Sequence, residues 1–236
     1  MEDPHSPLSL LLASTAHDMK NSISVLSGTL ERLLDEAAPG TGEACPQAAQ
    51  MAQMLYQTRR LNDKLMQLLA LYKQVGTSAY PFDVQPIEVG QLAEQVAANG
   101  RVLLASRGIR LELDIDPELV WHLDEDLIVG VVAHAVNNAV HYTRDRILLV
   151  ARERGGWLEI RVEDNGAGYP AALLEAGSAA MSGAASGVNF VTNSAGLGLH
   201  FAREVARMHR HRERGGAVRL ENGGLLGGGC FVLLLP

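Results

Sequence analysis

The chain has 236 residues, of which 47% are hydrophobic, and a formal net charge of −7. This is enough apolar material for one large domain or two modest ones, and too acidic for the surface of a nucleic-acid-binding protein. Its two cysteines, Cys45 and Cys230, are too far apart for a disulfide framework or a zinc site. The early apolar run at residues 8–13 is too short to span a membrane and follows acidic residues, unlike a signal peptide. We therefore expect a cytoplasmic protein with no membrane span and no nucleic-acid partner.

Residues 1–76 show the spacing of two long helices. Ser6 and Pro7 are typical of a helix start, and residues 39–42 interrupt two stretches in which seam positions recur at spacings of four and three. The first seam consists of Leu12, Ala16, Met19, Ile23, Leu26, Leu30 and Leu33, and the second of Met54, Thr58, Leu61, Leu65, Leu68, Tyr72 and Val75. We predict an antiparallel helical hairpin that pairs with a second copy as a homodimeric four-helix bundle, because one hairpin cannot cover both seams. The alternative is a hairpin packed on the rest of its own chain.

A second domain is predicted at residues 87–236, after a linker at residues 77–86. Its mixed periodicities indicate an α+β fold. Helices are expected at residues 92–107, 124–142 and 197–209, and strands at residues 109–115, 147–151, 157–163, 218–220 and 230–235. The basic run at residues 203–214 is interpreted as a solvated helix end rather than a binding patch.

Two segments of this domain carry candidate nucleotide chemistry. Asn138 lies near the end of a predicted helix and offers an oxygen ligand of the kind that Mg²⁺ prefers. Asp164 follows a predicted strand and can accept a hydrogen bond from an adenine amino group. Gly166 and Gly168 beside it allow the backbone to approach a base closely. Each feature is weak alone, since an Asp-x-Gly-x-Gly sequence is more often a turn.

A third segment, Gly196-Leu197-Gly198, opens a predicted helix, where backbone N–H groups can bind phosphate. In this order, with the glycine-, alanine- and serine-rich residues 169–195 between the last two, the combination strongly indicates ATP binding.

The three segments resemble the N, G1 and G2 boxes of sensor histidine kinases. The ATP-binding domain of that family is a two-layer α/β sandwich of the GHKL (Bergerat) type, shared with gyrase, Hsp90 and MutL. The resemblance implies ATP and Mg²⁺ as cofactors, with Asn138 as the metal ligand and a lid at residues 169–195 in which Phe190 corresponds to an aromatic residue. The nucleotide-binding set that it implies is Asn138, His141, Tyr142, Asp164, Gly166, Gly168, Gly196, Leu197 and Gly198.

The first helix contains a segment that resembles the H box of the same family. Ala16 and Met19 are seam positions, so His17 is expected beside the seam and turned toward solvent, with Asn21 one turn further on the same face. An exposed imidazole can attack a γ-phosphate, and a neighbouring carboxylate can hold the proton on its other nitrogen. The resemblance gives Asp18 that role, and gives Asn21 the placing of water for the reverse reaction.

The resemblance implies a histidine kinase that autophosphorylates His17 and passes the phosphoryl group to, or removes it from, an aspartate of a response regulator receiver domain. We expect no sensor segment in this sequence, so the signal is expected to come from a separate sensor protein through the bundle, or not at all.

Three departures from the family pattern concern charge at the phosphates. His134 replaces an Asn, His141 replaces a Lys or Arg, and residues 169–195 contain no Lys or Arg. Phosphoryl transfer depends on neutralising phosphate charge, so the sequence favours a slow kinase that acts more as a phosphatase or phosphotransfer protein. Alternatively, Arg144 or Arg146 supplies the charge.

Two other hypotheses remain at this stage. One is a catalytically weakened homologue that acts as a phosphotransfer, phosphatase or scaffold protein. The other is a Ser/Thr kinase like the anti-sigma-factor kinases with this ATP fold, although these lack the H box and the heptad hairpin.

Overall fold

The computed structural model describes residues 82–175 and 195–236, together with ten single positions between 23 and 61, all of them helical. The chain divides into two compact units, Met1–Pro81 and Phe82–Pro236. The hairpin predicted for residues 1–76 and the pairing of its copies lie largely outside the described residues, so both stay predictions. No helix in the described part of the chain is long and apolar enough to cross a lipid bilayer.

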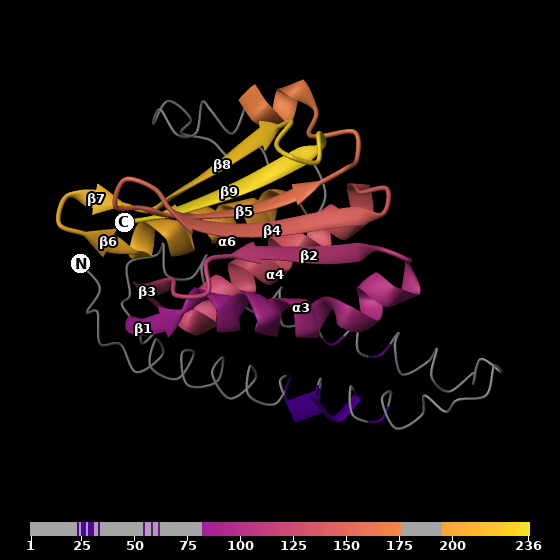
Figure 1. Cartoon of the computed structure of the whole chain (residues 1–236), viewed down its shortest axis with the longest axis horizontal. Helices are drawn as coiled ribbons and strands as arrows, with labels where there is room; N and C mark the ends of the chain where they lie inside the picture. Colours follow the sequence, from indigo (N-terminus) through magenta and orange to yellow (C-terminus); the bar gives the residue numbers. More distant parts are fainter. Residues whose placement is uncertain are drawn as a thin grey trace, which may run out of the picture. The chain divides into compact units, whose positions relative to one another are not determined.

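A five-stranded sheet forms the centre of the second unit, in the order β2–β4–β5–β9–β8 (Figure 1). β2 runs parallel to β4, and the other neighbours are antiparallel. The strands are β2 (Arg110–Ile115), β4 (Arg146–Glu153), β5 (Leu158–Asp164), β8 (Ala217–Asn222) and β9 (Gly229–Leu235). All five strands predicted from the sequence are therefore present, with ends that differ by one or two residues.

Three helices pack against the sheet: α3 (Val89–Ser106), α4 (Glu125–Tyr142) and α6 (Ala195–Met208). α4 and α6 lie behind the sheet in Figure 1, while α3 packs along α4 and the edge strand β2. The core between the layers includes strand side chains that are at most 1% exposed, among them Ile147, Leu149, Leu158, Ile160 and Leu233. This is the two-layer α/β sandwich that the sequence predicts.

A short ribbon at the start of this unit was not predicted. β1 (Gln85–Glu88) pairs with β3 (Val120–Leu123) in antiparallel register, so the last two residues of the predicted linker belong to a strand. α3 also begins three residues earlier than expected, at Val89, whose side chain is buried and whose N–H donates to the carbonyl of Leu119 (2.9 Å). Strands of four residues are too short to show a period in the sequence, which is why the ribbon was missed.

Asp124 connects this ribbon to α4. Its Oδ1 accepts from the N–H of Leu127 (3.1 Å) and caps the helix, and its Oδ2 accepts from the N–H of Asp83 (3.0 Å). The N–H of Asp124 donates to Nε2 of His209 (3.0 Å), whose Nδ1 lies 2.8 Å from the carbonyl oxygen of Val205. His209 is therefore the neutral tautomer with its proton on Nδ1, and burial lowers the pKa of this imidazole. The ring of Phe82 packs edge-on against it, at 4.9 Å between centroids.

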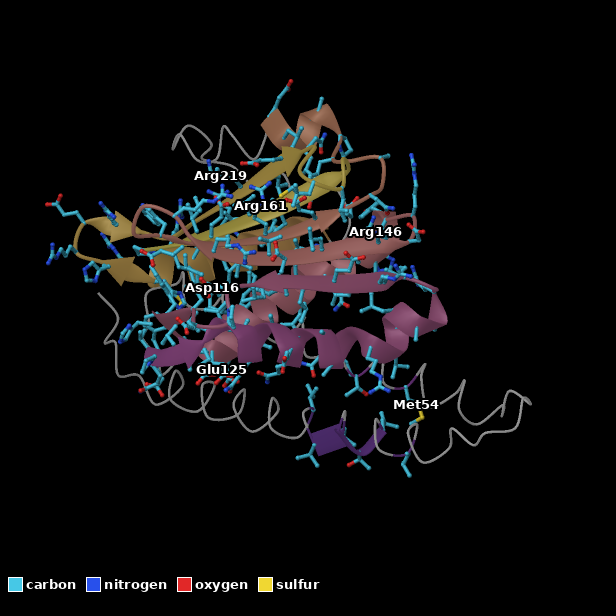
Figure 2. All side chains as sticks on the ribbon, in the orientation of Figure 1. Met54, Asp116, Glu125, Arg146, Arg161 and Arg219 are labelled. Carbon is cyan, nitrogen blue, oxygen red and sulfur yellow. The ribbon has the colours of Figure 1, made fainter. Side chains whose placement is uncertain are left out.

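The face of the sheet opposite the helices carries a ladder of ion pairs. Arg161 on β5 lies within 4 Å of three carboxylates: Glu163 (2.9 Å), Glu221 (3.5 Å) and Glu159 (3.8 Å). Arg146 pairs with Glu112 (3.1 Å), Arg152 with Asp114, and Arg219 with Glu221 (3.9 Å). Figure 2 labels Arg146, Arg161 and Arg219 on the strands concerned. Every arginine of the sheet strands β4, β5 and β8 is thus committed to a carboxylate.

Only residues 203–208 of the basic run at residues 203–214 are the end of a helix, which corrects the interpretation from the sequence for the rest of the run. α6 ends at Met208, and the following residues form a hairpin of two short strands, β6 (Arg210–His211) and β7 (Arg214–Gly215). The turn requires a left-handed backbone at Arg212 (φ 55°). Cross-strand pairing after the buried His209, rather than helical continuation, sets the direction of this segment.

We predict that Asp124→Ala lowers the free energy of unfolding of this domain by about 2 kcal/mol, because it removes the α4 cap and the contact to Asp83 together. Urea denaturation followed by tryptophan fluorescence measures the change. Asp124→Asn keeps one acceptor oxygen and should lose less. The exposed Glu125→Ala is the matched control, and an equal loss there would contradict the assignment.

Candidate nucleotide-binding site

The site is built around Asp164, the last residue of β5, which is 5% exposed. Its Oδ1 accepts hydrogen bonds from the backbone N–H groups of Gly166 (2.7 Å) and Gly229 (3.2 Å). Two N–H donors on one oxygen fix the orientation of this carboxylate. No hydrogen bond with another described residue engages Oδ2, so one carboxylate oxygen is held and the other is left to accept from a ligand.

Glycines surround this carboxylate because no side chain would fit. A Cβ on Gly228 would lie 2.5 Å from Oδ1 of Asp164, and a Cβ on Gly229 would lie 2.8 Å from Oδ2. Gly228 ends the β8–β9 connection and Gly229 begins β9. The N–H of Gly228 also donates to the carbonyl of Asp164 (3.0 Å). The cradle around Asp164 therefore comes from two loops that lie 65 residues apart in the sequence.

Tyr169 is a neighbour of the carboxylate that sequence analysis did not single out. Its ring is 3.2 Å from the position that a Cβ on Gly229 would take. Burial and the nearby Asp164 charge raise the pKa of its hydroxyl well above the ordinary range. Tyr169 therefore presents a neutral phenol beside Asp164 at any physiological pH.

Asn222 at the end of β8 holds the loop that follows Asp164. Its Oδ1 accepts from the N–H of Tyr169 (2.7 Å), and its Nδ2 donates to the carbonyl of Tyr169 (2.9 Å). Gly168 adopts φ 81°, and a Cβ there would lie 2.8 Å from the same Oδ1. The predicted glycine at position 168 thus serves the loop in two ways, by its positive φ and by admitting the Asn222 amide.

The predicted helix and loop segments meet at Gly166. A Cβ at this position would lie 2.1 Å from the carbonyl oxygen of Tyr142, so only glycine lets the loop reach the end of α4. Asn165 holds the same loop to the residues that follow α4. Its Oδ1 accepts from the hydroxyl of Thr143 (2.8 Å) and from the N–H groups of Arg144 (3.1 Å) and Arg146 (3.2 Å). The tyrosine side chain itself points outward, with Tyr142 66% exposed.

Asn138 lies on α4, four residues before Tyr142, and is half-buried. In the described part of the chain its amide makes no hydrogen bond, so its oxygen is available to a hard cation. The described residues contain no cluster of three or more His, Cys, Asp or Glu that would hold a metal without a ligand. A Mg²⁺ ion held through one amide oxygen and the phosphates of a nucleotide fits this donor set.

His134 fills the space between α4 and the first turn of α6. Its Nε2 is buried without a hydrogen-bond partner among the described residues, and burial lowers the pKa of the imidazole. A Cβ on Gly198 would lie only 1.6 Å from this Nε2. Gly198 is therefore required by the bulk of His134, in addition to the phosphate contact that the sequence predicts for it.

Positive charge at the phosphate end is sparse among the described residues. Burial, and after it the charge of Arg107, lowers the pKa of His141, so this imidazole is neutral at pH 7. Arg146 is engaged by both oxygens of Glu112, each at 3.1 Å. Of the two arginines proposed as substitutes, only the exposed Arg144 has a guanidinium without a partner in the described part of the chain.

Several predicted residues lie outside the described part of the chain. These are His17, Asp18 and Asn21, together with most of the predicted lid, including Phe190. Gly196 and Leu197 fall in the first turn of α6. The structure brings together Tyr142, Asp164, Gly166 and Gly168. The positions that sequence analysis missed are Tyr169, Asn222, Gly228 and Gly229. Only the two glycines had a signal in the sequence, because they belong to the glycine-rich residues 223–229.

Comparison with known proteins agrees with this arrangement. Residues 123–236 match the family model described as "Histidine kinase-, DNA gyrase B-, and HSP90-like ATPase". The match contains α4, the Asp164 loop, α6 and the last two sheet strands, which are the parts that build the site.

Two curated relatives are similar over most of the chain. The phosphate regulon sensor protein PhoR of Pseudomonas aeruginosa is 30% identical over 205 residues, which are 85% of this chain and 45% of that protein. The sensor-like histidine kinase SenX3 of Mycolicibacterium smegmatis is 26% identical over 212 residues, 89% of this chain and 52% of that protein. The chain thus spans about half the length of the curated relatives it matches.

A solved structure shares the fold. Full-length ShkA in complex with AMPPNP aligns with a TM-score of 0.58 at 22% identity, over 95% of this chain and 44% of that one.

We predict that Gly198→Ala destabilises the domain by about 2 kcal/mol, because the new methyl group overlaps His134. In a His134→Ala background the same change should cost at least about 1 kcal/mol less. Chemical denaturation of the four proteins of this cycle measures the coupling. Gly130→Ala, whose Cβ would meet only Phe201 at 3.8 Å, is the control. Additive effects of the two changes would show that His134 does not set the need for glycine.

Proposed function

This chain belongs to the sensor histidine kinase family and carries its GHKL-type ATP-binding domain, and from that premise we propose that it phosphorylates His17 from ATP. The phosphoryl group would then pass to, or be removed from, an aspartate of a response regulator receiver domain. We place this activity in the cytoplasm, in a homodimer formed by the helical hairpin and governed by a separate sensor protein.

The observation that carries the proposal is the geometry of Asp164. One oxygen is fixed by two backbone N–H groups, and glycines keep the space around the other clear of side chains. A buried carboxylate of this kind accepts from an exocyclic amino group, and its charge disfavours a carbonyl oxygen in the same place. Adenine offers the amino group there and guanine the carbonyl, so the site favours ATP over GTP.

The phosphates would extend from this point toward the end of α4 and the start of α6. Asn138 would hold Mg²⁺ through its amide oxygen, and the first-turn N–H groups at Gly196 and Gly198 would face phosphate oxygens. ATP with bound Mg²⁺ supplies the transferable phosphoryl group and neutralises much of its charge. The chain itself contributes the orientation of the base, one metal ligand and helix-terminal N–H groups.

The acceptor would be the His17 imidazole on the hairpin. Asp18 would hold the proton on one ring nitrogen, which leaves the other nitrogen nucleophilic. Asn21, one helical turn later, would orient water when phosphate is removed from the regulator. These roles rest on the H-box resemblance.

A second candidate is favoured by the charge at the phosphate end. His134 is buried without a partner and His141 is neutral, while Arg146 is held by Glu112. Low positive charge weakens binding and transfer of a phosphoryl group. A homologue of this kind would act mainly as a phosphatase, a phosphotransfer protein or a scaffold.

One prediction of this proposal concerns labelling of the full chain with Mg²⁺ and γ-labelled ATP. Acid-labile label should appear on the wild type and be absent from His17→Gln and from Asn138→Ala. Asp164→Asn should also abolish it, because the amide keeps the shape but repels the amino group of adenine. Wild-type protein that binds ATP yet takes up no label would favour the second candidate.

Another prediction of this proposal concerns the effect of His141 on ATP affinity. His141→Lys should bind ATP about fivefold more tightly at pH 8, since it adds a fixed charge where the imidazole is neutral. Because the pKa of His141 is lowered, the wild type should gain affinity only as the pH falls below about 6.5, where the ring begins to protonate. Titration of a fluorescent ATP analogue from pH 5.5 to 8 measures both effects, with His141→Ala correcting for protonation of the phosphates. An equal pH slope in wild type and His141→Ala would exclude this role.

A further inference from the structure

The β6–β7 hairpin concentrates three arginines that make no ion pair in the described part of the chain. Arg210, Arg212 and Arg214 are exposed within five residues, and none forms an ion pair with a carboxylate of the described residues. Arg214 instead lies over the ring of Trp157, with 5.7 Å from Cζ to the ring centroid. This contrasts with β4, β5 and β8, whose arginines are all paired, and with the net charge of −7 of the chain.

A cavity of about 600 Å³ opens beside this hairpin. Phe82, Val84 and Trp121 contribute apolar walls, and Arg210 and His211 line the side toward the hairpin. Val84 is 41% exposed and Val120, also part of the wall, is 49% exposed. The cavity is therefore a largely apolar hollow, open to solvent, with Arg210 on its hairpin side.

The positive charge at the cavity comes from the hairpin, whose Arg210 lines the wall. The exposed Asp83, between Phe82 and Val84, and the α-carboxylate of Pro236 are the acidic groups near the other walls. His209 at its base is neutral, because both ring nitrogens are occupied and burial lowers its pKa. Trp121 also lines it and donates its indole N–H to the Pro236 backbone oxygen (3.2 Å). Glu213 in the hairpin turn is the one acidic residue among residues 209–215. Asp124 lies deeper and is only 4% exposed, with both oxygens bonded.

This cavity is separate from the nucleotide site. It adjoins Gly156, two residues before β5 begins. Asp164 is at the other end of β5, and a strand of that length spans about 20 Å. In Figure 1, β3, β6, β7 and the C-terminal end gather at one end of the domain. A ligand in the cavity would leave the Asp164 cradle open.

We propose that the cavity and the β6–β7 hairpin form a docking site for an acidic peptide segment of a partner protein, with an apolar side chain seated in the cavity. Carboxylates on either side of that anchor pair with Arg210 and Arg212. The site combines the two features of short-segment recognition, an apolar anchor pocket and complementary charge beside it. It does not depend on the kinase assignment.

The apolar walls favour a peptide over a nucleic acid. A phosphate backbone would pair with the arginines but would leave Val84, Val120 and Phe82 uncovered. The acidic remainder of the chain would also repel a long polyanion. A peptide needs only a few carboxylates and fills the hollow with carbon.

The test uses the full chain and a fluorescein-labelled hexapeptide, Glu-Asp-Leu-Phe-Glu-Asp, followed by fluorescence anisotropy. Binding should weaken about tenfold in the Arg210→Glu/Arg212→Glu variant and on raising the ionic strength from about 0.05 to about 0.5 M. Val84→Glu should also weaken it, since it places a carboxylate on the wall. Both tryptophans of the chain, Trp121 and Trp157, lie at this end, so intrinsic fluorescence should change on binding.

The matched control is Arg101→Glu/Arg110→Glu, which reverses two exposed arginines elsewhere on the domain. It should keep wild-type affinity, and circular dichroism should show that all variants are folded. The proposal is overturned if the control loses as much affinity as the hairpin variant. It is also overturned if Gln-Asn-Leu-Phe-Gln-Asn or Glu-Asp-Ser-Ser-Glu-Asp binds equally well. Tighter binding of single-stranded DNA than of the peptide would likewise assign the hairpin to nucleic acid.

Discussion

The nucleotide end of the domain depends on two consecutive carboxylates at the end of β5. Because successive side chains of a strand point to opposite faces, Glu163 faces the ion-pair ladder while Asp164 faces the helices. Glu163 is 2% exposed and accepts from Arg161 Nε (2.9 Å) and from the N–H of Leu225 (2.6 Å). Asp164 accepts from the N–H of Gly229 on the other side. Both carboxylates therefore accept hydrogen bonds from residues 225–229. These bonds hold that segment beside Asp164 and complete the cradle around its carboxylate.

This arrangement explains why a structural residue and a binding residue stand side by side. The buried charge of Glu163 is tolerated because a guanidinium and an N–H group compensate for its lost hydration. That compensation fixes the loop which in turn orients Asp164. The free oxygen of Asp164 is consequently preorganised, and a ligand that binds there does not have to order the loop.

Local sequence patterns were sufficient for the sheet and its helices, because hydrophobic period and glycine placement are properties of short windows. They located Asp164, Gly166 and Gly168 for the same reason. The requirement for glycine at positions 228 and 229 comes from an approach between distant loops, and the space taken by His134 comes from the packing of two helices. Neither can be read from a window of sequence. The basic hairpin was misjudged because a short strand pair after a helix looks like the end of that helix.

The contact between His134 and Gly198 has an evolutionary consequence. As long as a histidine occupies position 134, a side chain at position 198 meets its ring, so substitutions at 198 carry a stability penalty. A smaller residue at 134 would remove that penalty. The structure therefore favours an order of substitutions in which position 134 changes before position 198.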